Sequence, residues 1–162
     1  MDINLEEYIN ELAPGIAAAA KPTVLLLTCI DYRYAHRIVD LMDSKGLRQK
    51  YDIFALAGAA AGANQEPDWL KVLVAHIKVA RSIGHPIDRV MILEHRDCGA
   101  YKKFFGLEWD KVPPPEETAE HLREVKILSE SLREVFGDSL KIDSFLLARD
   151  QDDPLITRNG PK

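Results

Sequence analysis

Short apolar segments alternate with longer amphipathic segments along most of the chain. Each apolar segment has the length and the branched side chains of one buried strand. These segments are residues 23–28, 51–57, 88–94 and 140–148. The amphipathic segments carry apolar side chains every three or four positions, which predicts helices. They are residues 3–13, 34–44, 67–83 and 116–136. We expect Pro14 and Gly15 to interrupt the first helix and Pro67 to begin the third.

Strands that alternate with helices predict an α/β fold, in which a mostly parallel sheet of four to five strands lies between two helical layers. Ligands of such sheets bind at the carboxyl ends of the strands, where the winding direction reverses. The first strand ends in "TCIDYR" and the third in "LEHRDC". If both stretches contribute to one site, the first and third strands are neighbours and the core order is 2-1-3-4.

No internal repeat and no linker divides the chain, so residues 1–162 are expected to form a single domain. Residues 1–20 would be a helical arm and residues 149–162 a polar tail. The net charge of -5, without a long basic run, argues against a nucleic-acid partner. The apolar segments are too short to span a bilayer, and the acidic, amphipathic start is unlike a signal peptide. We therefore expect a cytoplasmic protein.

Five side chains at these two strand ends form the candidate site. Cys29, Asp31 and Arg33 follow the first strand, while His95 and Cys98 follow the third. Two thiolates and an imidazole are three good zinc ligands, and water or Asp31 would take the fourth position. Alternatively, Arg33 holds the Asp31 carboxylate bidentately, so that it stays ionised. Zinc lowers the pKa of a bound water from about 15.7 to about 7, which supplies a nucleophile near neutral pH.

The spacing of these residues resembles that of the β-class carbonic anhydrases. Cys29-x-Asp31-x-Arg33, followed by His95-x-x-Cys98-Gly99, is similar to the signature of that family, and the resemblance covers roughly residues 22–105. It implies one zinc ion per chain on the two cysteines and the histidine, with an aspartate–arginine dyad beside it. It also implies an α/β fold, a homodimer or higher oligomer, and a zinc-bound hydroxide that reversibly hydrates carbon dioxide to bicarbonate.

The chain departs from the family pattern at three places beside this signature. Tyr32 stands where the family usually has serine, and Glu94 stands where it has glycine before the ligand histidine. Only Ala57-Gly58 remains of the family's Arg-Asn-Ala-Gly stretch. Two alternatives stay open: a carbonyl sulfide or carbon disulfide hydrolase on the same zinc site, or a weakly active or non-catalytic zinc-binding homologue. Gly58, Gly99 and Tyr32 are candidates for the substrate pocket.

Other interpretations of the two cysteines compete with a zinc enzyme. A thiol nucleophile of the phosphatase or rhodanese type needs an arginine six positions beyond its cysteine, and neither cysteine has one. A redox pair of the two thiols remains possible. The stretch "GAAAGAN" is expected to pack closely beside the site, with Gly58 allowing the near approach. The remaining histidines are taken as ordinary helix or turn residues, and residues 116–120 as a solvated helix start. These histidines are His36, His76, His85 and His121.

Overall fold

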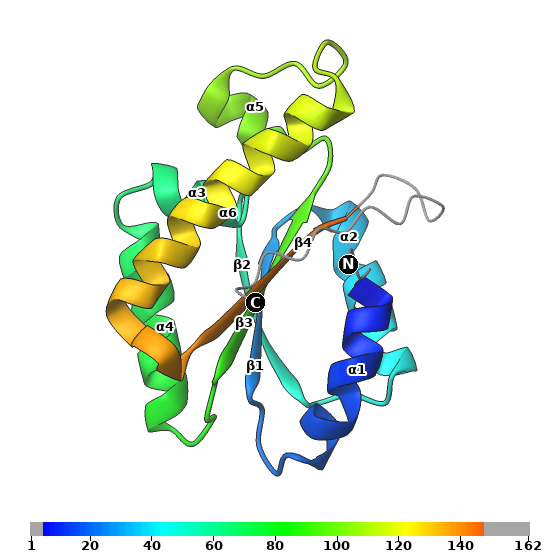
Figure 1. Ribbon diagram of the computed structural model, residues 1–162, viewed down its shortest axis with the longest axis vertical. Coiled ribbons are helices and arrows are strands. Elements are labelled where there is room, and N and C mark those ends of the chain that lie inside the picture. Colours follow the sequence, from blue (N-terminus) through cyan, green and yellow to red (C-terminus); the bar gives the residue numbers. More distant parts are fainter. Residues whose placement is uncertain (1–4, 148–162) are drawn as a thin grey trace.

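The computed structural model describes residues 5–147, which form an α/β fold around a four-stranded, all-parallel sheet (Figure 1). The strands are β1 (Val24–Cys29), β2 (Tyr51–Leu56), β3 (Arg89–His95) and β4 (Lys141–Leu147). Their order across the sheet is β2-β1-β3-β4, which confirms the predicted order. β1 and β3 are therefore hydrogen-bonded neighbours, and the winding direction reverses between them.

Helices cover both faces of the sheet, which confirms the predicted three layers (Figure 1). The helices are α1 (Leu5–Ala18), α2 (Tyr32–Ser44), α3 (Ala60–Gln65), α4 (Trp69–Ser82), α5 (Gly99–Phe105) and α6 (Pro114–Phe136), with a 3-10 turn η1 (Gly137–Ser139). α1 and α2 pack on one face, whereas α3, α4 and α6 pack on the other. α5 directly follows the carboxyl end of β3. No helix within residues 5–147 is long and apolar enough to cross a membrane.

β1 is apolar at consecutive positions because each of its faces is covered by a helical layer. Leu25 and Leu27 are 0% exposed and belong to the core under α3, α4 and α6. Val24 and Leu26 point the other way, into the core under α1 and α2. Burying one such leucine side chain contributes roughly 1.5–3 kcal/mol to stability. Two apolar cores thus fix the sheet that positions the strand ends.

Three local predictions differ from the structure. α1 runs through Pro14 and Gly15 without interruption, because residues on both sides of the proline, such as Leu5 and Ile16, are buried in one apolar core. α4 begins at Trp69 rather than at Pro67. The stretch after β2, expected only as close packing, forms the short helix α3. The predicted polar tail lies outside the described residues.

Candidate metal centre

The two cysteines and His95 converge at the carboxyl edge of the sheet. Cys29 is the last residue of β1 and His95 the last of β3, while Cys98 directly precedes α5. The carboxyl ends of β1 and β3 meet because these parallel strands are neighbours. The two sulfur atoms lie 3.9 Å apart. One ligand atom from each of the three residues lies within 4.8 Å of the others, so the side chains surround a space of metal-site dimensions.

The hydrogen bonding of His95 leaves one ring nitrogen available as a ligand. Its Nδ1 lies 2.9 Å from the carbonyl oxygen of Arg96, and a carbonyl can only accept a hydrogen bond. Nδ1 therefore carries a proton, and in the neutral ring Nε2 has the lone pair, beside the two sulfurs. Nε2 is buried and has no hydrogen-bond partner among the described residues. A cation bound at this point would satisfy it, whereas an orphaned buried polar atom costs about 1–3 kcal/mol.

A hydrogen bond joins the two cysteine side chains. This bond lowers the pKa of Cys29 to about 4, although burial opposes the shift. The same hydrogen bond, together with burial, raises the pKa of Cys98. Burial lowers the pKa of His95, but the neighbouring Cys29 sulfur outweighs it and the pKa of His95 is raised. The three groups together favour positive charge between them, and two sulfurs with one imidazole are the donor set that zinc prefers.

Asp31 and Arg33 form the predicted dyad beside these ligands. The Asp31 carboxylate accepts bonds from Arg33 Nε at 2.9 Å, Nη2 at 2.7 Å and the Arg33 backbone N–H at 3.0 Å. The Arg33 guanidinium lowers the pKa of Asp31 to about 2, so this carboxyl is ionised at neutral pH. Its Oδ2 lies 3.7 Å from His95 Nε2. Arg33 keeps a charged acceptor at the edge of the ligand cluster.

Arg33 also joins the two strand ends, a connection that the sequence does not reveal. Its Nη1 lies 3.3 Å from Asp97 Oδ2, and its Nη2 donates to the Asp97 carbonyl oxygen at 3.1 Å. Asp97 takes the left-handed backbone conformation of this turn, with φ 58, which aspartate tolerates better than most residues. The turn into α5 therefore depends on Asp97 rather than on Gly99, which has no positive φ.

α6 holds this turn from the other side. Glu117 accepts the Asp97 backbone N–H at 2.6 Å and pairs with Arg96 at 3.0 Å. Glu117 is only 4% exposed, so the expectation of a solvated helix start is wrong at this position. His121, predicted to be an ordinary helix residue, lies in α6, is 1% exposed and has its Nδ1 3.0 Å from Glu94 Oε2.

A helical stripe in the sequence could have identified these residues. Glu117, His121 and Glu124 extend the apolar stripe through Leu128 toward the start of α6, at spacings of three and four residues. All four are buried. Polar residues that continue an apolar stripe are therefore the signal that was available.

The three candidate pocket residues have different surroundings. Gly58 donates its backbone N–H to Cys29 Sγ at 3.3 Å, and a Cβ at Gly58 would lie 2.9 Å from the Cβ of Ala100. This confirms that Gly58 allows a near approach beside the ligands. Gly99 begins α5, and Tyr32 is 83% exposed at the start of α2. A role for any of the three in substrate binding stays a prediction.

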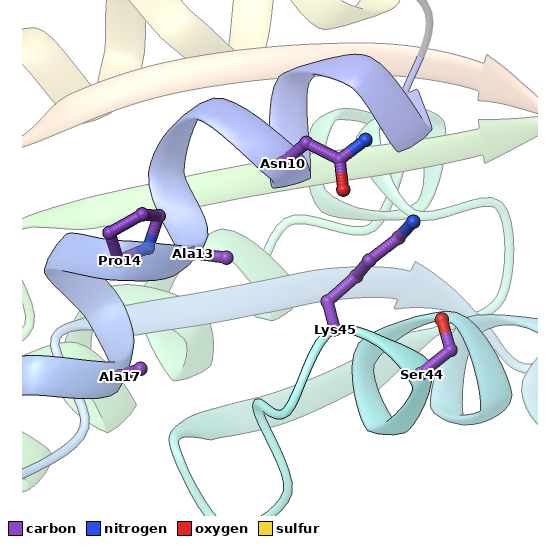
Figure 2. A pocket seen from close by; sticks show the side chains of 6 residues that line it. All are labelled: Asn10, Ala13, Pro14, Ala17, Ser44 and Lys45. Carbon is purple, nitrogen blue, oxygen red and sulfur yellow. The ribbon is translucent and has the colours of Figure 1, made fainter.

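A hollow of about 420 Å³ lies away from this centre, between α1 and the carboxyl end of α2 (Figure 2). Its lining residues are Asn10, Ala13, Pro14, Ala17, Ser44 and Lys45. Lys45 is the one charged residue among those that line the hollow, and its ammonium group pairs with Glu6 at 2.7 Å. None of the predicted site residues lines this hollow, so it is separate from the metal centre.

Comparison with known proteins finds one family, two relatives and two solved structures that are similar to this chain. Residues 19–141 match the family described as "Putative carbonic anhydrase". An uncharacterized protein of Rickettsia conorii is 30% identical over 130 residues, which cover 79% of this chain and 68% of that protein. Another, from Rickettsia bellii, is 30% identical over 131 residues, covering 79% of this chain and 77% of that protein.

Two solved structures are similar at lower identity. A carbon disulfide hydrolase in its apo form has 15% identity and a TM-score of 0.45, with 87% of this chain and 81% of that chain covered. The β-carbonic anhydrase CafA of Aspergillus fumigatus has 17% identity and a TM-score of 0.44, with 94% of this chain and 82% of that chain covered.

Proposed function

Because the chain belongs to the "Putative carbonic anhydrase" family, we propose that it binds one zinc ion and reversibly hydrates carbon dioxide to bicarbonate. Cys29, His95 and Cys98 would hold the ion. The observation that carries this proposal is their convergence, with a buried Nε2 that has no hydrogen-bond partner among the described residues and lies beside two sulfurs 3.9 Å apart. Bound zinc lowers the pKa of water toward 7 and so supplies a nucleophile near neutral pH.

Asp31 and Arg33 would orient the attacking water. Asp31 is ionised at neutral pH because Arg33 lowers its pKa to about 2, so its carboxylate can only accept a hydrogen bond from that water. A water held in this way would have an oxygen lone pair free for the carbon of carbon dioxide, and the proton released on forming bicarbonate would leave to solvent. Both oxygens of Asp31 are bonded to Arg33, which supports water rather than Asp31 as the fourth ligand.

We also propose that the chain associates with a second copy of itself, as the family resemblance implies. Apolar side chains exposed along β2 and α4 support this, since a monomer gains nothing from leaving them in water. They include Ile53 of β2 at 45%, Val79 of α4 at 57% and Ile83, directly after α4, at 67% exposure. Light scattering during size-exclusion chromatography would give twice the chain mass or a higher multiple, and a single-chain mass would contradict association.

Zinc content and hydration kinetics test the proposed reaction together. We expect about one zinc per chain and stopped-flow hydration of carbon dioxide. We also expect loss of both in Cys29→Ser, because a missing thiolate leaves two protein ligands. His36→Ala is the matched control, since His36 is an exposed histidine of α2. Wild-type protein with much less than one zinc would overturn the proposal. Sulfide release from carbonyl sulfide or carbon disulfide, without hydration of carbon dioxide, would favour the hydrolase. If the protein binds zinc but shows neither activity, a non-catalytic zinc protein would be favoured.

A further inference from the structure

The Glu94 carboxyl group is buried directly before a proposed zinc ligand, and both of its oxygens are used. Glu94 is 2% exposed, its Oε1 accepts the backbone N–H of Ala60 at 2.8 Å, and its Oε2 lies 3.0 Å from His121 Nδ1. A buried carboxyl group without such partners would carry a desolvation cost of several kcal/mol. Glu94 thus connects the end of β3 to the start of α3 and to the middle of α6.

The bond to Ala60 replaces a cap that α3 lacks. The residue before α3 is Ala59, whose side chain cannot accept a hydrogen bond from the first turn. Glu94 supplies this acceptor from a different strand. Gly58, two residues before Ala60, donates its N–H to Cys29 Sγ. The position of the Gly58 N–H that bonds Cys29 therefore depends on where Glu94 holds the start of α3.

His121 links the same carboxyl group to the turn that carries Cys98. Its ring lies 4.1 Å from the Tyr101 ring of α5 and is stacked on Trp109 at 6.0 Å. Trp109 in turn donates its indole N–H to the carbonyl oxygen of Cys98 at 2.9 Å. His121 therefore contacts Glu94, Tyr101 and Trp109 directly. Through them it is linked to the groups that hold all three proposed ligands.

Given the zinc site proposed above, we infer that Glu94 and His121 are positioning residues of that centre. Within residues 5–147, neither is hydrogen-bonded to the three ligand side chains. Glu94 sets the Gly58 N–H against Cys29 and adjoins His95 in the chain, while His121 holds Glu94 against the rings that support Cys98. Partners behind the ligands of a metal commonly change its affinity by about 10–100-fold when removed. The glutamate at this position is thus part of how this chain holds zinc.

Competition with a chromogenic chelator tests the two residues by zinc affinity. Glu94→Leu removes both acceptors, and His121→Phe keeps a ring between Tyr101 and Trp109 but removes Nδ1. We expect each to weaken zinc binding by about 10–100-fold. Glu94→Gln should stay within about threefold of wild type, because its amide oxygen can accept the Ala60 N–H and its NH₂ can face His121.

Asp143→Asn is the matched control for a loss of stability alone. Asp143 is a buried carboxylate, 4% exposed, which pairs with Arg89 near the amino ends of β3 and β4. We expect it to lower the melting temperature while zinc affinity stays unchanged. The cobalt-substituted protein adds a spectroscopic readout. Glu94→Leu should shift the thiolate-to-cobalt absorption band, and Asp143→Asn should not.

Hydrogen exchange in the zinc-free protein gives a readout that needs no metal. Loss of the Glu94 carboxyl should speed exchange of the Ala60 and Gly58 amides relative to Asp143→Asn. If Glu94→Leu does not fold, zinc affinity and hydrogen exchange are measured in His121→Phe, and its results test the inference. Wild-type protein that binds zinc, with unchanged affinity in Glu94→Leu or His121→Phe, would overturn the inference and leave the proposed function standing. Wild-type protein that binds no zinc would overturn both.

Discussion

Gly58→Ala is the substitution whose effect the structure specifies most fully. Gly58 has φ +78, and an added Cβ would lie 2.9 Å from the Cβ of Ala100 on α5. The left-handed backbone costs a residue with a Cβ roughly 1–2 kcal/mol. Overpacking against Ala100 costs roughly 1–3 kcal/mol more, since a methyl group cannot rotate away. Reduced entropy of the unfolded chain offsets about 0.4–1 kcal/mol. The net expected loss of unfolding free energy is about 1–5 kcal/mol, with a midpoint of about 3 kcal/mol.

Gly46→Ala is the matched control, because Gly46 has φ +71 but no atom within 4 Å of the added Cβ. It should cost only the backbone term, about 1 kcal/mol. At roughly 2–4 °C per kcal/mol, calorimetry of the zinc-free proteins should show a drop of about 6–12 °C for Gly58→Ala at that midpoint and of a few degrees for Gly46→Ala. Zinc affinity should fall only in Gly58→Ala, whose N–H bonds Cys29. Equal melting temperatures for the two variants would refute the close approach of Gly58 to α5.

Three further substitutions separate the dyad, the turn and the surface. In zinc-free Arg33→Ala, NMR titration should show the pKa of Asp31 rising from about 2 toward its ordinary value of 3.8. Because Arg33 lowers this pKa, the pair stabilises the fold above pH 4, and the stabilisation is lost as pH falls through about 2. An unchanged pKa would contradict the dyad. Arg96→Met should lower the free energy of unfolding in urea by roughly 3–5 kcal/mol, because the buried Glu117 loses its ion-pair partner. Combining Arg96→Met with Glu117→Gln should recover part of this loss, and no recovery would contradict the Arg96–Glu117 pair. Tyr32→Ser should change stability by less than about 0.5 kcal/mol and leave zinc binding intact, since Tyr32 is 83% exposed; a larger loss would show that it packs against a partner.

The sheet and the convergence of Cys29, His95 and Cys98 could be predicted because both depend on local pattern. A strand covered on two faces must be apolar at consecutive positions, and β1 shows this directly. The order of the strands followed from placing Cys29 and His95 at one site, which requires β1 and β3 to be neighbours.

The stripe of α6 could have marked Glu117 and His121 as buried, but the partners of these supports could not be predicted, because they come from contacts between distant elements. Glu117 and His121 lie among charged neighbours in the sequence, and only the packing of α6 over the strand ends buries them. Glu94 appeared as a departure from the family pattern, and its partners Ala60 and His121 are 34 and 27 residues away. Sequence spacing reports the ligands of a site more readily than the groups that hold them.

X-ray absorption at the zinc edge tests the central claim most directly. For the zinc-loaded protein, we predict two sulfur ligands at about 2.3 Å and one imidazole nitrogen at about 2.0–2.1 Å. Cys29→Ser or Cys98→Ser should reduce the sulfur count to one in any zinc that remains bound. A zinc environment without sulfur, or one that neither cysteine substitution changes, would contradict a metal centre built from Cys29, His95 and Cys98.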